Sequence, residues 1–234
     1  MEIALISESD RLNPVELAFQ AAALDAQMRL HFAPAWGLEP WPVSAYAKLP
    51  TEHASLYHPM FVMDEIGAPD ALGFHDDTAQ FIYSRVLAPS DASDATTASH
   101  EACEERGDPT CDLWRPMPDG RLVALEASDA VETTDYPITV TLNGETRTIR
   151  VSNFCLPDWW KAGSSGPWDY LGLLRGPFQL LPGGYMIVQH QDGRTENVYA
   201  DRAVGKLLAF KRADPMSRTS RRHAKASAAR TASR

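Results

Sequence analysis

The stretch "ALGFHDDTAQFIYSRVLAPSDASDATTASHEACEERGDP", residues 71–109, decides the fold because it predicts a hairpin followed directly by a helix. Apolar segments lie on both sides of the Asp-Asp-Thr sequence at residues 76–78, and short polar residues of this kind favour turns. We therefore expect two antiparallel strands, at about residues 71–77 and 80–87.

The second half of the stretch carries start and stop signals for a helix. Ser93 and Asp94 are candidate N-cap residues, because such side chains accept hydrogen bonds from the first amides of a helix. Gly107 favours a helix end, and Pro109 lies just beyond it. These signals predict a helix from about residue 95 to residue 106.

The N-terminal segment predicts a buried strand and a long helix. Residues 2–7, "EIALIS", form a short apolar run. Asn13 stands at an N-cap position and Pro14 at the first helical position of an alanine-rich segment whose apolar residues recur at helical spacing. This helix is expected to run to residue 32 and to end before the proline-rich loop at residues 33–42.

Further strands complete the predicted fold. Asn143-Gly144 marks the turn of the clearest hairpin, and Asp192-Gly193 marks a second one. The expected strands lie within residues 42–49, 58–66, 121–132, 136–154 and 183–200. This order predicts an α+β fold with a mixed sheet, in which the helix at residues 95–106 lies under the sheet. A single domain is expected over residues 1–210, with residues 170–210 as a peripheral hairpin region.

The C-terminal tail differs in charge from the rest of the chain. Residues 211–234 contain eight Lys or Arg and one Asp, a net charge of +7, so the preceding 210 residues carry −16 of the total of −9. The tail is rich in Ser, Ala and Arg, which predicts disorder in isolation. Its function is either contact with nucleic acid or an acidic protein surface, or simple solvation of the chain end.

Composition and cysteine use indicate a globular protein without a membrane partner. The chain has 234 residues, of which 44% are hydrophobic. No apolar run approaches the roughly 20 residues of a membrane span, and no basic leader precedes the first strand. We expect a cytoplasmic location, or a virion-associated one if the protein is phage-encoded. Cys103, Cys111 and Cys155 form no C-x-x-C pair and are predicted to be buried or reduced thiols.

His100-Glu101-x-x-Glu104 is the motif that points to chemistry. Positions four apart lie on one face of a helix, so His100 and Glu104 can hold one metal ion together. Glu101 is turned by about 100° and can act beside the ion as a general base without ligating it. The H-E-x-x-H motif of metalloproteases divides its roles in this way. A glutamate in place of the second histidine adds negative charge, which widens the choice from zinc to manganese, iron or calcium.

The same motif has a plain alternative. A pattern of this kind arises by chance in on the order of a few chains in a hundred at ordinary residue usage. The helix would then expose a solvated face formed by Glu101, Glu104, Glu105 and Arg106.

Carboxylates after the helix are candidate third ligands. The reversal at Gly107-Asp108 can return the Asp108 carboxylate towards the motif. The downstream segment "ALEASDAVE" supplies three more carboxylates, at Glu126, Asp129 and Glu132.

His75 and three tryptophans are further candidates near the same place. His75 lies in the hairpin before the helix, where it is either a ligand or a group that binds a substrate carbonyl. The alternative is a hairpin histidine bonded to the neighbouring aspartates. Trp159, Trp160 and Trp168 either wall a cleft or fill the core.

Four segments resemble, in order, a zincin-like family of bacterial and phage proteins. The family pattern is S-H-E-x-x-E-x-x-x-D-P, followed by E-x-x-D-x-x-E and V-S-[ND]-F-x-x-P-x-W. The matching segments are "GFHDD" (73–77), "SHEACEERGDP" (99–109), "ALEASDAVE" (124–132) and "VSNFCLPDWW" (151–160). The resemblance covers about residues 10–160. Where the family has Cys-Asp-Pro, this chain has Ser128-Asp129-Ala130, which keeps the carboxylate.

The resemblance implies a zincin-like mixed sheet with a long N-terminal helix, a short metal-binding helix and C-terminal hairpins. It also implies a metallopeptidase-like site, in which His100 and Glu104 bind the ion and Glu101 is the general base. The third ligand would be Glu126 or Asp129, with Asp108 next. A zincin-type hydrolase places the edge strand that holds its extended substrate just before this helix.

Two functions from different classes are therefore expected. One is a metal-dependent hydrolase that acts on a peptide or protein substrate. The other is a non-catalytic virion or assembly protein on the same fold, whose basic tail contacts nucleic acid or a partner subunit. The sequence contains no phosphate-binding glycine loop and no G-x-S-x-G elbow, which argues against nucleotide-binding and serine-hydrolase chemistry.

Overall fold

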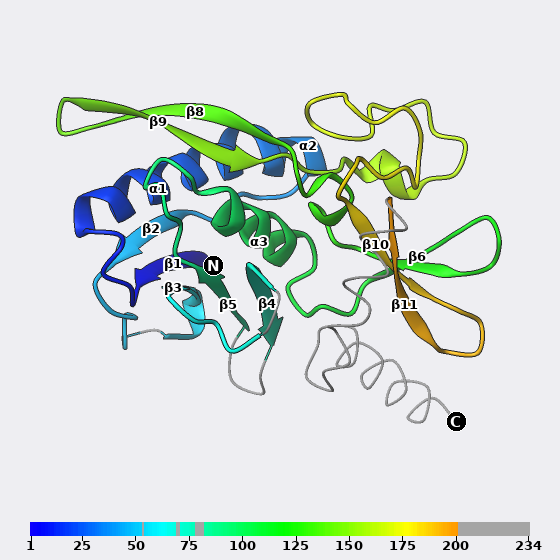
Figure 1. Ribbon diagram of the computed structural model, residues 1–234, viewed down its shortest axis with the longest axis horizontal. Helices are drawn as coiled ribbons and strands as arrows, with labels where there is room; N and C mark the ends of the chain where they lie inside the picture. The colour runs from blue at the N-terminus through cyan, green and yellow to red at the C-terminus, as the bar shows by residue number, and fades with distance from the viewer. Residues whose placement is uncertain (53, 69–70, 78–81, 201–234) are drawn as a thin grey trace.

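The computed structural model describes residues 1–52, 54–68, 71–77 and 82–200, and it combines helices with two sheets and a hairpin (Figure 1). The predicted basic tail and the turn of the first hairpin fall outside the described residues. The prediction of a fold that combines helices with a mixed sheet is confirmed.

The first sheet has five strands in the order β2-β1-β3-β5-β4. These strands are β1 (Glu2–Ser7), β2 (Val43–Tyr46), β3 (Tyr57–Met63), β4 (Gly73–Asp77) and β5 (Ile82–Leu87). Neighbouring strands are parallel except for β4, which is antiparallel to β5. Ile3, Ala4 and Leu5 of β1 are fully buried, as expected for a central parallel strand that is covered on both faces.

The N-terminal helix begins as predicted and ends later than predicted. α1 (Pro14–Gln27) starts with a capping box, in which the Asn13 side chain and Glu16 satisfy each other's backbone amides. The chain continues through a π-helical turn (Met28–Phe32) into α2 (Ala33–Trp36) and stops at Gly37, whose φ is 64°. The expected end before residue 33 was wrong, because Pro34 lies in the first turn of α2, where a missing amide costs nothing.

The helix that carries the motif, α3 (Thr96–Gly107), lies between two layers of strands. It packs on β4 and β5 on one side and on β9 on the other. Figure 1 shows α1 and α3 between the first sheet and the hairpin of β8 (Asp135–Leu142) and β9 (Glu145–Ser152). The residues from Ala98 to Glu105 are consequently all buried. The solvated-face alternative is therefore wrong for the three glutamates of this helix.

A second, antiparallel sheet lies to the right in Figure 1, with the strand order β11-β10-β7-β6. Its strands are β6 (Trp114–Pro116), β7 (Leu122–Ala124), β10 (Tyr185–Gln189) and β11 (Thr195–Tyr199). The C-terminal hairpin expected at the periphery thus pairs through β10 with β7. Strand β6 was not predicted, because three residues that end in a proline are too few to show the alternation of apolar and polar residues typical of a strand.

Local predictions about turns and thiols hold. Asn143 and Gly144, between β8 and β9, have φ values of 51° and 83°, which is the conformation of a two-residue hairpin turn. Cys103, Cys111 and Cys155 are free and buried. Short 3-10 turns lie at Ala54–Leu56, Asp129–Val131 and Pro157–Trp160. Within the described residues, every helix is too short or too polar to cross a bilayer.

Candidate metal centre

Three elements bring the predicted site residues together. α3 contributes His100, Glu101 and Glu104, and β4 contributes His75 from the strand packed beside it. Asp129 begins the 3-10 turn that follows β7. The structure groups these residues into two sets of three whose ligand atoms lie within 4.8 Å of one another, and Glu104 belongs to both sets.

The first set consists of His100, Glu104 and Asp129. The Nε2 atom of His100 lies 3.2 Å from Oε1 of Glu104 and 3.2 Å from Oδ1 of Asp129. The backbone amide of Ser128 donates to the same Oε1 of Glu104 at 3.2 Å, which orients that carboxylate. Of the predicted third ligands, Asp129 is thus the one that joins the pair on α3.

These spacings suit ligands of one ion. Two donor atoms about 2.0–2.1 Å from a tetrahedral zinc are roughly 3.4 Å apart. By contrast, a charge-assisted hydrogen bond between a histidine and a carboxylate has a length of about 2.7–2.9 Å. The donor set, one imidazole nitrogen and two carboxylates, is one that zinc accepts and that also admits manganese or iron. The residues present therefore fit a divalent cation.

The second set consists of His75, Glu101 and Glu104. The Nδ1 atom of His75 lies 3.3 Å from Oε2 of Glu101 and 3.7 Å from Oε2 of Glu104. Its other nitrogen, Nε2, lies 3.3 Å from the backbone carbonyl oxygen of Asp108. His75 is fully buried and lies close to two glutamates of α3, which the sequence did not predict. Its predicted hydrogen bond to a neighbouring aspartate stays a prediction.

Gly73 of β4 makes room for the Glu101 side chain. A Cβ atom at residue 73 would lie 2.8 Å from Oε1 of Glu101 and 2.9 Å from the methyl group of Thr97. Both contacts are closer than real Cβ atoms tolerate. A glycine at this point of the edge strand therefore lets α3 approach β4 with its carboxylate between them.

The charge of this region favours a cation. Glu101, Glu104 and Asp129 are each at most 2% exposed, and the buried side chains among the described residues include no lysine or arginine. Burial lowers the pKa of His100, but the carboxylates of Glu104 and Asp129 outweigh it and hold that pKa well above its usual value. The surroundings of His100 thus stabilise positive charge, whether it comes from a proton or from a metal ion.

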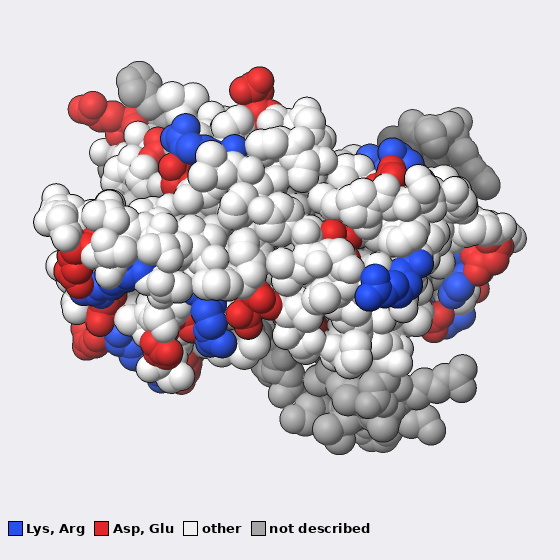
Figure 2. Space-filling model, turned by 90° about the horizontal axis from the view of Figure 1, so that it is seen from above, with Lys and Arg blue, Asp and Glu red and all other residues white. Residues whose placement is uncertain are grey.

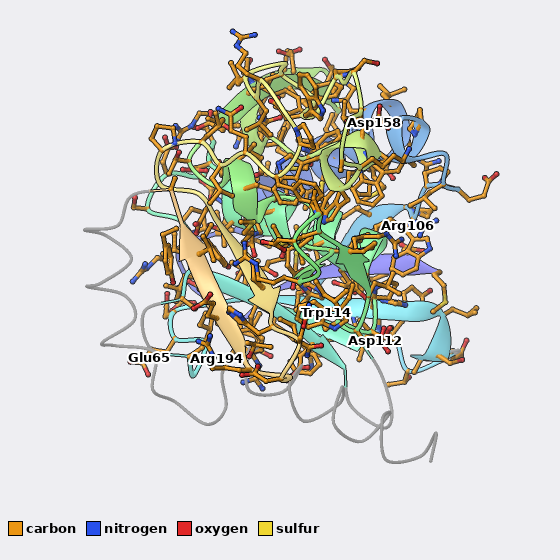
Figure 3. All side chains as sticks on the ribbon, turned by 90° about the vertical axis from the view of Figure 1, so that its right-hand side faces the viewer. Glu65, Arg106, Asp112, Trp114, Asp158 and Arg194 are labelled. Carbon is orange, nitrogen blue, oxygen red and sulfur yellow. The ribbon has the colours of Figure 1, made fainter. Side chains whose placement is uncertain are left out.

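Two other predicted ligands serve different purposes or lie apart. The Asp108 carboxylate accepts hydrogen bonds from the backbone amides of Asp112 at 3.1 Å and Leu113 at 3.0 Å. It therefore fixes the connection from α3 to Trp114 of β6, which Figure 3 shows from the side of the second sheet. Glu126 is buried but belongs to neither set of three. The expectations for Asp108 and Glu126 as third ligands thus lack support in the geometry.

Sequence reasoning missed the role of Glu105, the third buried acid of α3. Glu105 is fully buried, with Nδ1 of His58 at 2.8 Å from Oε1 and the Ser84 hydroxyl at 2.5 Å from Oε2. His58 comes from β3 and Ser84 from β5, so this group ties the helix to the sheet. A histidine inside an apolar strand segment was the only available signal.

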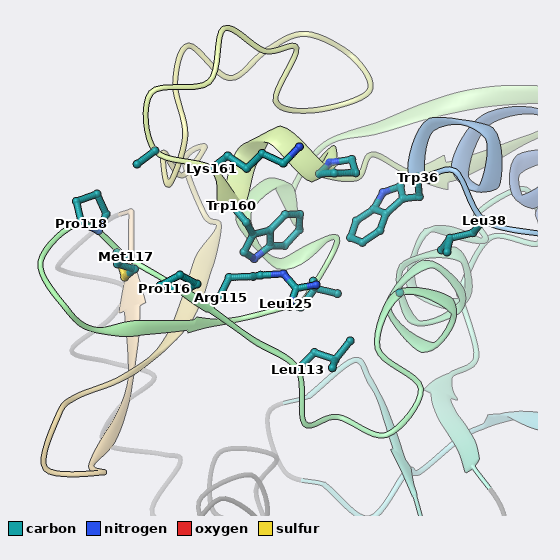
Figure 4. Close-up of a pocket in the computed structure, with 13 residues that line it drawn as sticks. Trp36, Leu38, Leu113, Arg115, Pro116, Met117, Pro118, Leu125, Trp160 and Lys161 are labelled. Carbon is teal, nitrogen blue, oxygen red and sulfur yellow. The ribbon is translucent and has the colours of Figure 1, made fainter.

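A pocket lies beside the end of α3 (Figure 4). It has a volume of about 830 Å³, and its lining is mainly apolar and aromatic. Trp36 and Trp160 meet edge to face in its wall with ring centroids 5.5 Å apart, while Arg115 and Lys161 supply positive charge. Of the tryptophans considered in the sequence, Trp159 lies in the core and Trp160 serves both core and pocket.

The surface seen from above carries charges of both signs. Figure 2 shows Lys and Arg interspersed with Asp and Glu on this face, with a broad uncharged area between them.

Comparison with known protein families, curated proteins and solved structures finds no match to this chain.

Proposed function

We propose that the protein is a metal-dependent hydrolase with a zincin-like fold, and that its substrate is a peptide or protein. The observation that carries this proposal is the placement of His100 Nε2 at 3.2 Å from carboxylate oxygens of both Glu104 and Asp129. His100, Glu104 and Asp129 would hold the ion, which we take to be zinc, with manganese, iron or calcium as alternatives.

The bound ion would supply a Lewis acid that polarises a carbonyl group and makes water easier to deprotonate. Glu101 lies one position after His100 and, like the ligands, is buried. Its role would be to take the proton from the attacking water and pass it to the leaving amine. Ser128 holds Glu104 in place through its backbone amide, so the ligand geometry is fixed before a substrate arrives.

The surroundings offer a path for an extended substrate. Within the described residues, β4 is an edge strand of the first sheet. An edge strand can pair with a peptide backbone. The apolar pocket at the end of α3 would accept a side chain of that peptide. His100, at 9% exposure, is the most exposed member of the two sets and marks the side from which solvent reaches the site.

The test is metal analysis combined with peptide hydrolysis on the full chain. We expect at least one equivalent of zinc or another transition metal in the purified protein, and fewer equivalents in His100→Ala and in Glu104→Ala. His190→Ala is the matched control, because His190 pairs with Glu196 away from the site. Glu101→Gln should retain the ion held by His100, Glu104 and Asp129 and lose hydrolysis of a peptide library by at least about 100-fold. A wild type that binds no added zinc would contradict the proposal.

Burial of the ligands favours a second candidate function, in which the ion only staples the fold of a virion or assembly protein. Structural sites are closed, whereas catalytic ones keep a position open to substrate. In that case Glu101→Gln would leave every property of the protein intact, while loss of metal would lower the free energy of unfolding. The basic tail would then carry the function, and deletion of residues 211–234 would abolish assembly.

A further inference from the structure

The second set of ligands, His75, Glu101 and Glu104, has the geometry of a cation site of its own. We propose that the protein holds a pair of divalent cations, bridged by the carboxylate of Glu104. This inference deepens the proposed function, and it rests on it because both ions share Glu104. One ion would lie between His100, Asp129 and Oε1 of Glu104, and the other between His75, Glu101 and Oε2 of Glu104.

The two oxygens of Glu104 already face different partners. Oε1 lies 3.2 Å from the His100 ring, while Oε2 lies 3.7 Å from the His75 ring. A carboxylate that offers one oxygen to each of two donor sets is the arrangement that bridges paired ions. Metal ions in two-metal sites are about 3.5–4 Å apart, which one bridging carboxylate spans.

The orientation of the His75 ring supports a cation at its Nδ1 atom. Its Nε2 atom lies 3.3 Å from the Asp108 carbonyl oxygen, and a carbonyl oxygen only accepts hydrogen bonds. The Glu101 carboxylate, at the same distance of 3.3 Å from Nδ1, also only accepts, so a neutral ring with its single proton on Nε2 leaves Nδ1 facing carboxylates with no proton between them. A neutral ring then turns the Nδ1 lone pair towards the carboxylates of Glu101 and Glu104. Metal-binding histidines show this pattern, with the second ring nitrogen donating to a backbone carbonyl.

The contact of His75 with Glu101 is longer than a second histidine–glutamate contact on the same helix. His75 Nδ1 lies 3.3 Å from Glu101, whereas His58 Nδ1 lies 2.8 Å from Glu105 on the same helix. The longer value is close to the roughly 3.4 Å expected between two ligands of one ion. The same helix thus carries one acid at a short hydrogen-bond distance from a histidine and another at 3.3 Å, which is close to the spacing of two ligands of one ion.

Charge also calls for more than one ion. With neutral histidines, Glu101, Glu104 and Asp129 place three negative charges in a region where the described residues bury no lysine or arginine. One divalent ion compensates two of these charges. A second ion compensates the third, and its two nearest carboxylates, Glu101 and Glu104, are those of the second set.

The experiment counts Mn²⁺ bound to the full chain after treatment with a chelator, by equilibrium dialysis. We expect two equivalents in the wild type and one in His75→Ala, in Glu101→Gln and in Asp129→Asn. Circular dichroism of each variant confirms folding, and Glu101→Gln, which keeps the size of the side chain, covers the case in which His75→Ala does not fold. His190→Ala should keep two equivalents.

Electron paramagnetic resonance of bound Mn²⁺ provides a second readout. Two bridged ions should give a coupled spectrum in the wild type and the six-line signal of an isolated ion in Glu101→Gln. One equivalent in both the wild type and Glu101→Gln would overturn the pair and leave the proposed function standing. No binding in the wild type would overturn both.

Discussion

Two buried acid–histidine groups on α3 differ in their distances and in their number of carboxylates. Glu105 meets one histidine at 2.8 Å and one serine hydroxyl, and it ties α3 to β3 and β5. Glu104 lies between two histidines at 3.2 Å and 3.7 Å, with two further carboxylates beside them. The first group has its hydrogen bonds made by protein atoms at short distance. The second has more acids than histidines, and its histidine–carboxylate distances of 3.2 Å and 3.7 Å exceed the 2.8 Å of the first group.

The difference teaches how to tell a structural acid from a ligand when both are fully buried. Burial alone does not separate Glu104 from Glu105, since both are 0% exposed. What separates them is the number of acids for each histidine and the distances between the atoms. We take the short contacts of Glu105 as those of a structural group, and we propose that the excess of carboxylates around Glu104 is balanced by a bound cation.

The largest expected effect comes from breaking the structural group. His58→Ala leaves the buried Glu105 carboxylate with the Ser84 hydroxyl but without its histidine, and we expect the free energy of unfolding to fall by about 3–5 kcal/mol. Urea denaturation in the presence of a chelator measures this change. His190→Ala, which removes a similar pair at the surface, should cost less than about 1 kcal/mol. An equal loss of unfolding free energy in the two variants would show that the buried pair stabilises the protein no more than the surface pair does.

Asp129→Asn tests the ligand group. In chelator the change should be within about 1 kcal/mol, because removal of one of several clustered acids also removes repulsion. With Mn²⁺ at 100 times its dissociation constant the wild type should gain about 2.7 kcal/mol from each occupied site, and the variant should lose one such gain. Urea denaturation with and without Mn²⁺ measures both values. A variant that gains as much as the wild type would exclude Asp129 as a ligand.

Gly73→Ala tests the space that β4 leaves for Glu101. The added methyl group would lie 2.8 Å from the carboxylate, so the side chain or the strand must move, at a cost of about 1–3 kcal/mol. Gly107→Ala is the control, because a Cβ there meets its neighbours at ordinary contact distances of 3.5 Å or more. Thermal denaturation of the two variants measures the difference. Equal melting temperatures would mean that Glu101 moves freely.

The smallest effect concerns the thiols next to the site. Burial, and then the Glu104 carboxylate, raise the pKa of Cys103, and burial likewise raises the pKa of Cys155. A raised pKa leaves both thiols protonated and unreactive at pH 8. We expect alkylation of these two residues only on unfolding, as measured by mass spectrometry with and without urea. Rapid labelling of the native protein would show that the layers around α3 open.

The sequence predicted much of the fold because its signals are local. The capping box at Asn13 and the Asn143-Gly144 turn are decided by residues a few positions apart, and both hold in the structure. The continuation of the helix through residues 33–36 was missed, since Pro34 was taken as a stop although it lies in the first turn of α2. The pairing of β10 with β7 was also missed, because it joins residues far apart in the chain.

The candidate site was predictable in part. His100 and Glu104 lie one helical turn apart, so their proximity follows from the helix alone. The position of Asp129 depends on how the β7 segment docks on α3, and the sequence could not rank it against Glu126. The contact of His75 with Glu101 requires that β4 lie against α3, with Gly73 as the only local hint.

The segments that meet around Glu104 come from distant parts of the chain. His75 and Asp129 are 54 positions apart in the chain and belong to different sheets or their connections. An ion between such segments would be a reversible cross-link, because the segments could not separate until the ion dissociates. Unlike a disulfide, this cross-link would place no restraint on the unfolded chain. The lifetime of the folded protein should therefore follow the concentration of free metal around it, which would make its persistence a property of its surroundings as much as of its sequence.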